Sequence, residues 1–283
     1  MSETKKTSAE ERKAWALQMI ERFRVMDDTF MRQVFKDNPP LTQHVLRIIT
    51  RIDDLRLKES ETQRDLKSLA GSRSVMLDVF GIDAEGAQYD LEVQYGSTLD
   101  AKRVRYYSAG MDVDRLLPRE NFSALPEQWV IFVLERNGRA GGRATRLIES
   151  RDALTGEPLI DGTHTLVVNG AYRGKDELGQ LMADFCESDP DRIRDPLLRK
   201  RVQYLKRDPE GVRQMCAISE EIFNRGLEQG LEQGLEQGRD EGARGRLLEN
   251  VRSLMQTVGW SAQEALENLM VPKEEQGRYL AML

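Results

Sequence analysis

Two carboxylates lie in the middle of neighbouring segments that have the pattern of β-strands. The stretch MLDVFGIDAEGAQYDLEVQY, residues 76–95, forms two apolar runs around a turn, with Asp78 in the first run and Glu92 in the second. An unpaired carboxylate in a low-dielectric site is unfavourable unless a metal or a partner compensates its charge. Two carboxylates and a carbonyl suit a hard cation such as Mg²⁺, which would polarise a phosphodiester and lower the pKa of an attacking water.

The pairing of these carboxylates depends on the register of the predicted hairpin. Strand alternation predicts one face made of Met76, Asp78, Phe80 and Ile82 on the first strand, and of Gln88, Asp90, Glu92 and Gln94 on the second. Asp78 and Glu92 face each other only if paired residues have numbers that sum to about 170, which requires a loop of three or five residues or a bulge. A four-residue loop made of DAEG would place Glu92 on the face of Leu77.

A simpler interpretation of the same segment involves no metal. Half-exposed polar faces are common in antiparallel sheets. In that case Gln88 and Asp90 are exposed residues of an edge strand, and backbone donors cap Asp78. Periodicity alone leaves both interpretations open.

The order of predicted elements around the hairpin indicates a compact α/β or α+β core. An amphipathic helix over 41–52 precedes strands near 55–62, 74–82 and 87–95, and a helix over 100–113 with Asp100 as N-cap precedes an apolar strand over 129–135. A helix is also expected over 8–25, further strands over 146–170, and mainly helices over 175–222.

A basic segment at 192–207 contains seven Lys or Arg residues and one acid. One interpretation is that it contacts DNA phosphates, which dominate affinity for DNA. The favoured interpretation is a solvated helix whose apolar residues face the core, namely Leu197, Leu198, Val202 and Leu205.

The run RGLEQGLEQGLEQGRDEG is the clear internal repeat, with a glycine at every fourth position. Leu, Glu and Gln favour helix, whereas each glycine costs about 1 kcal/mol relative to alanine in a helix interior. The segment is therefore either a supported helix, able to self-associate through residues 222–258, or a flexible solvated spacer. Further on, Ser261 and Glu264 form a capping box, and Pro272 opens a last short helix.

These signals divide the chain into five parts. We expect an N-terminal helix at 1–26, a core at 27–175, a helical region at 176–225, the repeat as helix or spacer at 226–245, and a C-terminal helical segment at 246–283.

Composition and charge exclude several classes of protein. No run of about 18 apolar residues is present, so we expect no membrane span. The N-terminus lacks the apolar core of a signal peptide, which predicts a cytoplasmic protein. Two cysteines without CxxC spacing and two histidines make a structural zinc site or a disulfide framework unexpected. The net charge of −6 argues against a general nucleic-acid coat, although a local basic cleft is compatible with it.

An ordered set of segments resembles the Rpn-type recombination-promoting nucleases, also called PD-(D/E)xK nuclease family transposases. The segments are Asp78, then EVQ with Glu92 and Gln94, RVRYYSAGMD, LPEQWVIFVLE, DDTFMRQVFKDNP, DGTHTLVVNGAYRG, LGQLMADF, PEGVRQMC and the LEQG array. The resemblance covers nearly the whole chain from about residue 25. It implies a restriction-endonuclease-like core of helix, three antiparallel strands, helix and strand, followed by a helical C-terminal extension.

The resemblance also implies roles for individual residues. Asp78 and Glu92 would bind Mg²⁺ or Mn²⁺, and Gln94 stands where the superfamily has a lysine that helps to activate water. Glutamine can hydrogen-bond a water but carries no charge; this variant occurs in the Rpn-type group. Lys102 or Arg103 could supply the charge, and Lys102, Arg103 and Arg105 are candidates for DNA contact or for surface solubility alone.

The function expected from these observations is a magnesium-dependent deoxyribonuclease, an endonuclease that could promote DNA recombination. It would act on DNA with little sequence specificity, because no predicted helix has the features of a base-reading element. One alternative is a catalytically weak protein with the nuclease fold that binds DNA or a partner through its C-terminal helices. A purely structural assembly protein, binding neither metal nor DNA, is a third possibility. A homodimer through the C-terminal helices is compatible with these hypotheses, and a flexible solvated spacer remains the alternative.

Overall fold

The structure is a computed structural model that describes residues 9–66, 75–136 and 141–283. Residues 1–8 of the expected N-terminal helix and residue 74 of an expected strand lie outside these ranges. The chain divides into two compact units, one ending at Ser219 and the other comprising Glu220–Leu283. Helix α7 (Pro209–Thr257) contributes residues to both units.

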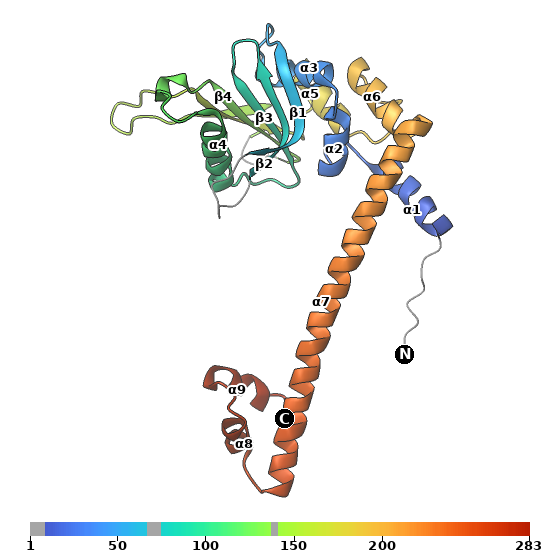
Figure 1. Cartoon of the computed structure of the whole chain (residues 1–283), viewed down its shortest axis with the longest axis vertical. Coiled ribbons are helices and arrows are strands. Elements are labelled where there is room, and N and C mark those ends of the chain that lie inside the picture. The colour runs from blue at the N-terminus through green and yellow to red at the C-terminus, as the bar shows by residue number, and fades with distance from the viewer. Residues whose placement is uncertain (1–8, 67–74, 137–140) are drawn as a thin grey trace. The chain divides into compact units, whose positions relative to one another are not determined.

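The first unit is a mixed α/β fold built on a six-stranded sheet (Figure 1). Its strands are β1 (Leu57–Leu66), β2 (Val75–Asp83), β3 (Gln88–Gln94), β4 (Gln128–Leu134), β5 (Thr145–Ile148) and β6 (Thr163–Asn169). Its helices besides α7 are α1 (Ala9–Arg22), α2 (Asp28–Phe35), α3 (Pro39–Thr50), α4 (Ala101–Arg115), the 3-10 helix η1 (Phe122–Ala124), α5 (Glu177–Phe185) and α6 (Pro196–Arg207).

The sheet has the order β1-β2-β3-β4-β6-β5. Strands β1, β2 and β3 are antiparallel neighbours, β3, β4 and β6 run parallel, and β5 is antiparallel to β6. The predicted succession of helix, three antiparallel strands, helix and strand is therefore present as α3, β1–β3, α4 and β4. Strand β3 lies in the interior of the sheet, so both of its edges are paired with neighbouring strands.

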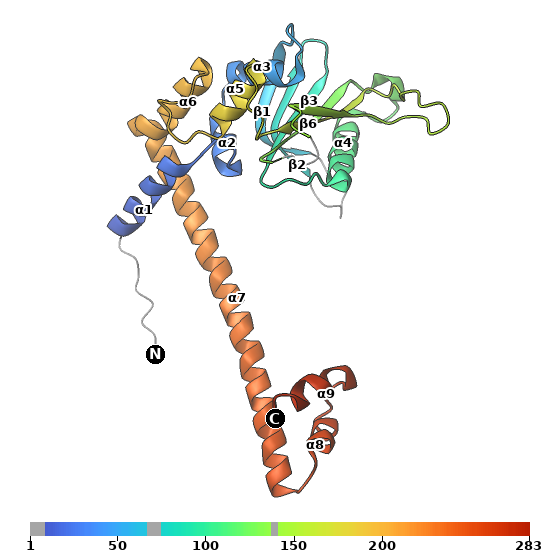
Figure 2. The ribbon, with the colours of Figure 1, turned by 180° about the vertical axis from the view of Figure 1, so that it is seen from behind.

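Each face of the sheet carries its own apolar core. Helix α4 covers one face, where Val104 and Met111 pack against residues such as Phe80 and Phe132. Helices α2, α3 and α5 cover the other face, as the views from the front and from behind both show (Figures 1 and 2). The sheet thus presents the polar residues of β2 and β3 to helices on both sides.

The helix caps predicted from the sequence are present in the structure. The Asp100 side chain accepts the backbone N–H groups of Lys102 and Arg103 and so begins α4 as predicted. The capping box of Ser261 and Glu264 is present, and Pro272 is the N-cap of the last helix. In α6 three of the four predicted apolar residues are buried, but Leu197 is 42% exposed, so its predicted orientation is wrong.

The predicted alternation of strand β2 is wrong around Asp78. Val75, Leu77 and Phe80 all pack in the core on the α4 side, Val79 packs in the opposite core, and Met76 is 47% exposed. A shared face of Met76, Asp78, Phe80 and Ile82 therefore does not exist. The irregularity coincides with Gln63 of β1, which has a positive φ of 58° and lies opposite Asp78, between the pairs Thr62–Val79 and Arg64–Leu77.

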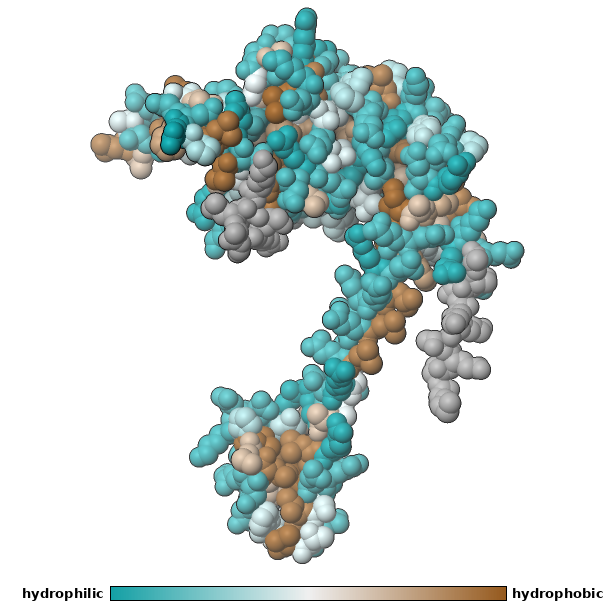
Figure 3. Space-filling model, viewed as in Figure 1, coloured by the Kyte–Doolittle hydropathy of each residue, from teal (hydrophilic) through white to brown (hydrophobic). Residues whose placement is uncertain are grey.

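The second unit consists of the later part of α7, α8 (Ala262–Asn268) and α9 (Lys273–Leu280). Its small core contains Val251, Ala265, Leu266 and Val271. The glycine repeat is helical, and apolar surface runs along α7 where Leu227, Leu231 and Leu235 are each more than half exposed (Figure 3). Added Cβ atoms at the repeat glycines would meet no atom within 4 Å.

Neither Cys186 nor Cys216 forms a disulfide within the part of the chain that the structure describes. Within the ranges that the structure describes, no helix combines the length and the apolar character needed to cross a bilayer.

Replacing Gly230, Gly234 and Gly238 together with alanine should stabilise the repeat helix. Each substitution favours helix by about 1 kcal/mol, and open space surrounds each position. We expect backbone amides of the repeat to exchange hydrogen at least about tenfold more slowly, measured by hydrogen–deuterium exchange mass spectrometry.

The control is Gly179→Ala in α5. There the added Cβ would lie 2.2 Å from the carbonyl oxygen of Gly174, so this variant should lower the thermal midpoint. Unchanged exchange in the triple variant would contradict the continuous helix.

Candidate functional site

The β2–β3 hairpin has the register that the carboxylate pair requires. Val79 pairs with Leu91 and Phe80 with Asp90, so the numbers of paired residues sum to 170 as predicted. The five-residue loop 83–87 closes the hairpin. Within it, Asp83 Oδ1 accepts the backbone N–H groups of Glu85 and Ala87.

Asp78 and Glu92 meet just beyond the last pair of this ladder. The backbone N–H of Asp78 donates to Glu92 Oε1 at 3.0 Å, and the two side chains also interact with each other. Asp78 is 6% exposed and Glu92 is 1% exposed. The structure therefore brings the two predicted metal ligands together in a site largely closed to water.

Arginines from opposite sides of the sheet hold the two carboxylates. Arg32 of α2 donates through Nε to Asp78 Oδ1 at 3.0 Å, and Arg103 of α4 donates through Nη2 to Glu92 Oε2 at 2.5 Å. The Arg103 guanidinium also lies over the ring of Tyr107, 4.9 Å from its centroid. These contacts compensate part of the negative charge that the hairpin buries.

Asp90 is a third carboxylate of this site. It is 0% exposed, and neither of its carboxylate oxygens has a hydrogen-bond partner in the structure. Gln88 is buried as well, so the interpretation of both residues as exposed on an edge strand is wrong. The reason is that β3 lies between β2 and β4, in the interior of the sheet.

Burial raises the pKa of all three carboxyl groups, and repulsion from a nearby carboxylate adds to each shift. The pKa of Glu92 rises to about 8, first because the group is buried and then because Asp78 is close. Burial and the charges of Glu92 and Asp78 place the pKa of Asp90 well above its ordinary value. Burial and Asp28 raise the pKa of Asp78, and Arg32 opposes that shift. Such a cluster favours the uptake of protons or of a cation.

Gln94 lies on the same face of β3 as Glu92. Their partners on β4, Leu134 and Phe132, both belong to the core on the α4 side. Gln94 Nε2 donates to the carbonyl oxygen of Thr98 at 3.0 Å, which fixes the amide, and Oε1 is buried without a partner in the structure. Oε1 is therefore a buried acceptor whose direction the fold fixes.

Of the three cationic candidates on α4, the structure brings only Arg103 to the carboxylates. Lys102 and Arg105 are exposed on the same helix. Tyr107 packs against Phe132, as expected of a packing residue, whereas Tyr106 is 42% exposed.

The donor set fits a hard divalent cation held by two carboxylates. Among the described residues, no group of three or more His, Cys, Asp or Glu side chains could hold a metal ion. Asp78 and Glu92 nevertheless supply the oxygen donors that Mg²⁺ prefers, and Mg²⁺ commonly uses one or two carboxylates and several waters. A bound cation would favour the ionised form of Asp90, whose pKa is raised by burial and by the neighbouring carboxylates.

Sequence reasoning missed Arg32 and helix α2. The helix buries Phe30, Met31, Val34 and Phe35, a spacing that is itself a helical signal. Asp28 and Arg32 are one helical turn apart, which is the spacing of an ion pair on a helix. Nothing in the sequence indicates that this pair reaches Asp78, 46 residues further along the chain.

Comparisons with protein-family models, with curated proteins and with solved structures find no match to this chain.

In the metal-free protein, stability should fall as the pH rises from about 4.5 to about 8. The pKa of Glu92 is higher in the folded state than its ordinary value of 4.5, so the stabilisation that protonation gives is complete below pH 4.5 and is lost as the pH rises through 8. We expect a loss on the order of 1–3 kcal/mol in the free energy of unfolding, measured by urea titration with a chelator present.

Glu92→Gln should flatten this dependence, because the amide does not ionise. The control is Glu85→Gln, in the exposed turn of the same hairpin, which should keep the wild-type profile. Identical pH profiles for wild type and Glu92→Gln would show that Glu92 titrates normally.

Proposed function

We propose that this protein is a metal-dependent DNA endonuclease of the Rpn-type recombination-promoting group, with a restriction-endonuclease-like core. The observation that carries the proposal is the meeting of Asp78 and Glu92 at the junction of β2 and β3. The order α3, β1–β3, α4, β4 agrees with the core that the sequence resemblance implies. The buried carboxyl groups, with raised pKa values, supply negative charge that a divalent cation would neutralise.

Asp78 and Glu92 are the residues that would hold Mg²⁺ or Mn²⁺. Such an ion, when bound, polarises the phosphodiester and lowers the pKa of the attacking water. Gln94 Oε1 accepts a hydrogen bond from that water and orients its oxygen toward phosphorus. Arg103, with 38% of its side chain exposed, provides the positive charge that Gln94 lacks.

The reaction is hydrolysis of one phosphodiester bond. The water oxygen loses one proton to solvent and forms a bond to phosphorus. The bond from phosphorus to the leaving oxygen breaks, and the leaving oxygen takes up one proton from solvent. Lys102 and Arg105, exposed on α4, contact the flanking phosphates. Because these contacts are made to the DNA backbone, affinity should depend on salt and little on sequence.

The test is nicking of supercoiled plasmid in the presence of Mg²⁺ or Mn²⁺. Asp78→Ala and Glu92→Ala should each lower the rate at least about a hundredfold, because the loss of residues that merely support metal ligands already costs about 10–100-fold. Glu85→Gln, in the turn of the same hairpin, should cut at the wild-type rate. Equal nicking rates for wild type and both alanine variants would show that the proposal is wrong.

A non-cutting protein that binds DNA or a partner is the second candidate function. One observation favours it: in the structure both Glu92 oxygens and Asp78 Oδ1 already have protein partners, and Gln94 carries no charge. DNA binding that persists without any metal-dependent cutting would support this candidate.

We also propose that the C-terminal helices pair two copies of the chain. Leu227, Leu231 and Leu235 recur at every fourth residue of α7 and stay exposed in the single chain. Replacing the three leucines with glutamine should halve the mass of the full chain measured by light scattering. A monomeric wild type would contradict the pairing.

A further inference from the structure

We propose that Arg32 is a positioning residue that orients Asp78 for cation binding. This inference rests on the proposed metal-dependent function and adds a residue from outside the hairpin. It starts from the contacts of a single guanidinium that bridges two carboxylates on different elements.

The Arg32 guanidinium uses two of its donor atoms. Nε donates to Asp78 Oδ1 at 3.0 Å on β2, and Nη2 donates to Asp28 Oδ2 at 2.6 Å in the first turn of α2. A planar guanidinium presents its donors in a rigid fork, so anchoring one donor fixes the direction of the other. A lysine, with a single ammonium group on a flexible chain, cannot hold two carboxylates in the same fixed geometry.

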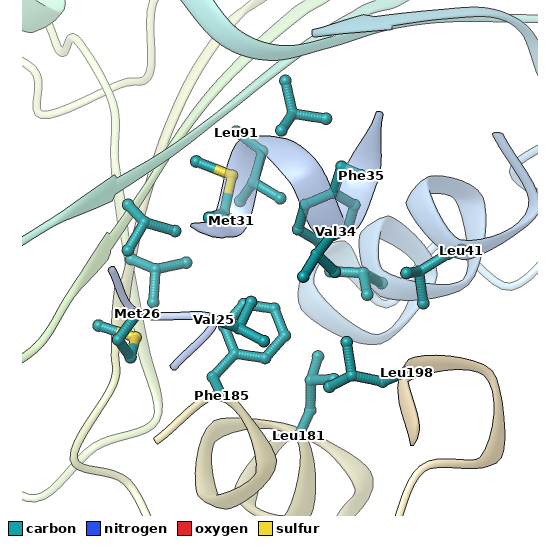
Figure 4. Close-up of a cluster of buried hydrophobic side chains, with 14 of the residues drawn as sticks. Val25, Met26, Met31, Val34, Phe35, Leu41, Leu91, Leu181, Phe185 and Leu198 are labelled. Carbon is teal, nitrogen blue, oxygen red and sulfur yellow. The ribbon is translucent and has the colours of Figure 1, made fainter. Parts of the chain in front are cut away.

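Helix α2 has anchors of its own and does not need Arg32 to stay in place. Met31, Val34 and Phe35 pack in the apolar core beside Leu91 and other residues (Figure 4). At the other end of the helix, the Arg201 guanidinium donates to the carbonyl oxygens of Gln33, Val34 and Lys36. Arg32 is therefore held at a fixed position by a rigid helix, which is what a positioning residue requires.

The consequence is an oriented carboxylate. With Oδ1 held by Arg32, Asp78 Oδ2 is the oxygen that a cation would use, and Glu92 interacts with the same side chain. Residues that hydrogen-bond a ligating carboxylate commonly contribute about 10–100-fold to metal affinity or activity. An arginine that merely competed with the metal for Asp78 would have the opposite effect, because its removal would strengthen metal binding.

The experiment measures Mn²⁺ binding to the full chain by electron paramagnetic resonance, together with plasmid nicking. Arg32→Gln should weaken Mn²⁺ binding about tenfold and lower kcat with little change in KM for DNA. Arg32→Lys should recover part of the affinity at most, because it keeps the charge and loses the fork. Asp28→Asn weakens the hold on Arg32 Nη2, so it should also weaken Mn²⁺ binding, by a smaller factor.

The matched control is Arg24→Gln. Arg24 has a similar exposed fraction, 31% against 26% for Arg32, and also bridges two carboxylates, Asp27 at 3.0 Å and Glu135 at 3.6 Å. This variant should leave Mn²⁺ affinity unchanged, and its thermal midpoint provides the reference for any loss of stability in Arg32→Gln.

Three results would overturn the inference: unchanged or tighter Mn²⁺ binding by Arg32→Gln, full recovery by Arg32→Lys, or equal weakening by Arg24→Gln. A different result is expected if the proposed function is wrong: Mn²⁺ binding by the wild type would then not depend on Asp78. If wild type binds Mn²⁺ through Asp78 and Arg32→Gln binds it equally well, only the role of Arg32 is lost.

Discussion

The site depends on the burial of like charges at the junction of two strands. Asp78, Asp90 and Glu92 share a region from which water is largely excluded. Asp78 raises the pKa of Glu92, and both of these residues raise the pKa of Asp90. Charges in such a region interact more strongly than in water, so they must be protonated, paired or bound to a cation. The structure pairs only part of this charge with arginines, and the remainder is the physical basis for the proposed binding of a cation.

An arginine from a helix on each face of the sheet compensates part of this buried charge. Arg32 comes from α2 and Arg103 comes from α4, and each helix is fixed by its own apolar core. Strand β3 is interior, so its polar residues cannot turn to solvent to avoid one another. The break in alternation at Asp78 places that residue within reach of α2 while its backbone N–H still contacts Glu92. Because of this one irregularity in β2, the neighbouring carboxylates contact helices on both faces of the sheet.

The stability of the second unit depends on a different balance, between a small apolar core and a helix that exposes leucines and glycines. Its small core is formed by the end of α7 with α8 and α9, whereas the repeat exposes both its leucines and its glycines. Glycine disfavours helix and exposed leucine favours association. A helix with both features gains stability when a partner covers the leucines, which is the physical basis for the proposed pairing.

The sequence by itself determined what depends on neighbours along the chain. Apolar runs around a short turn located the hairpin, and Asp100 and Ser261 marked helix starts, because caps and turns act over a few residues. The sequence left two registers of the hairpin open, and the structure has the one with a five-residue loop. Only the tertiary structure decided that Asp90 is buried and that Met76 and Phe80 point to different surroundings. It alone placed Arg32 on Asp78, since that contact depends on the packing of a helix against a strand distant in the chain. Local periodicity contains no information about which distant cation reaches a given carboxylate.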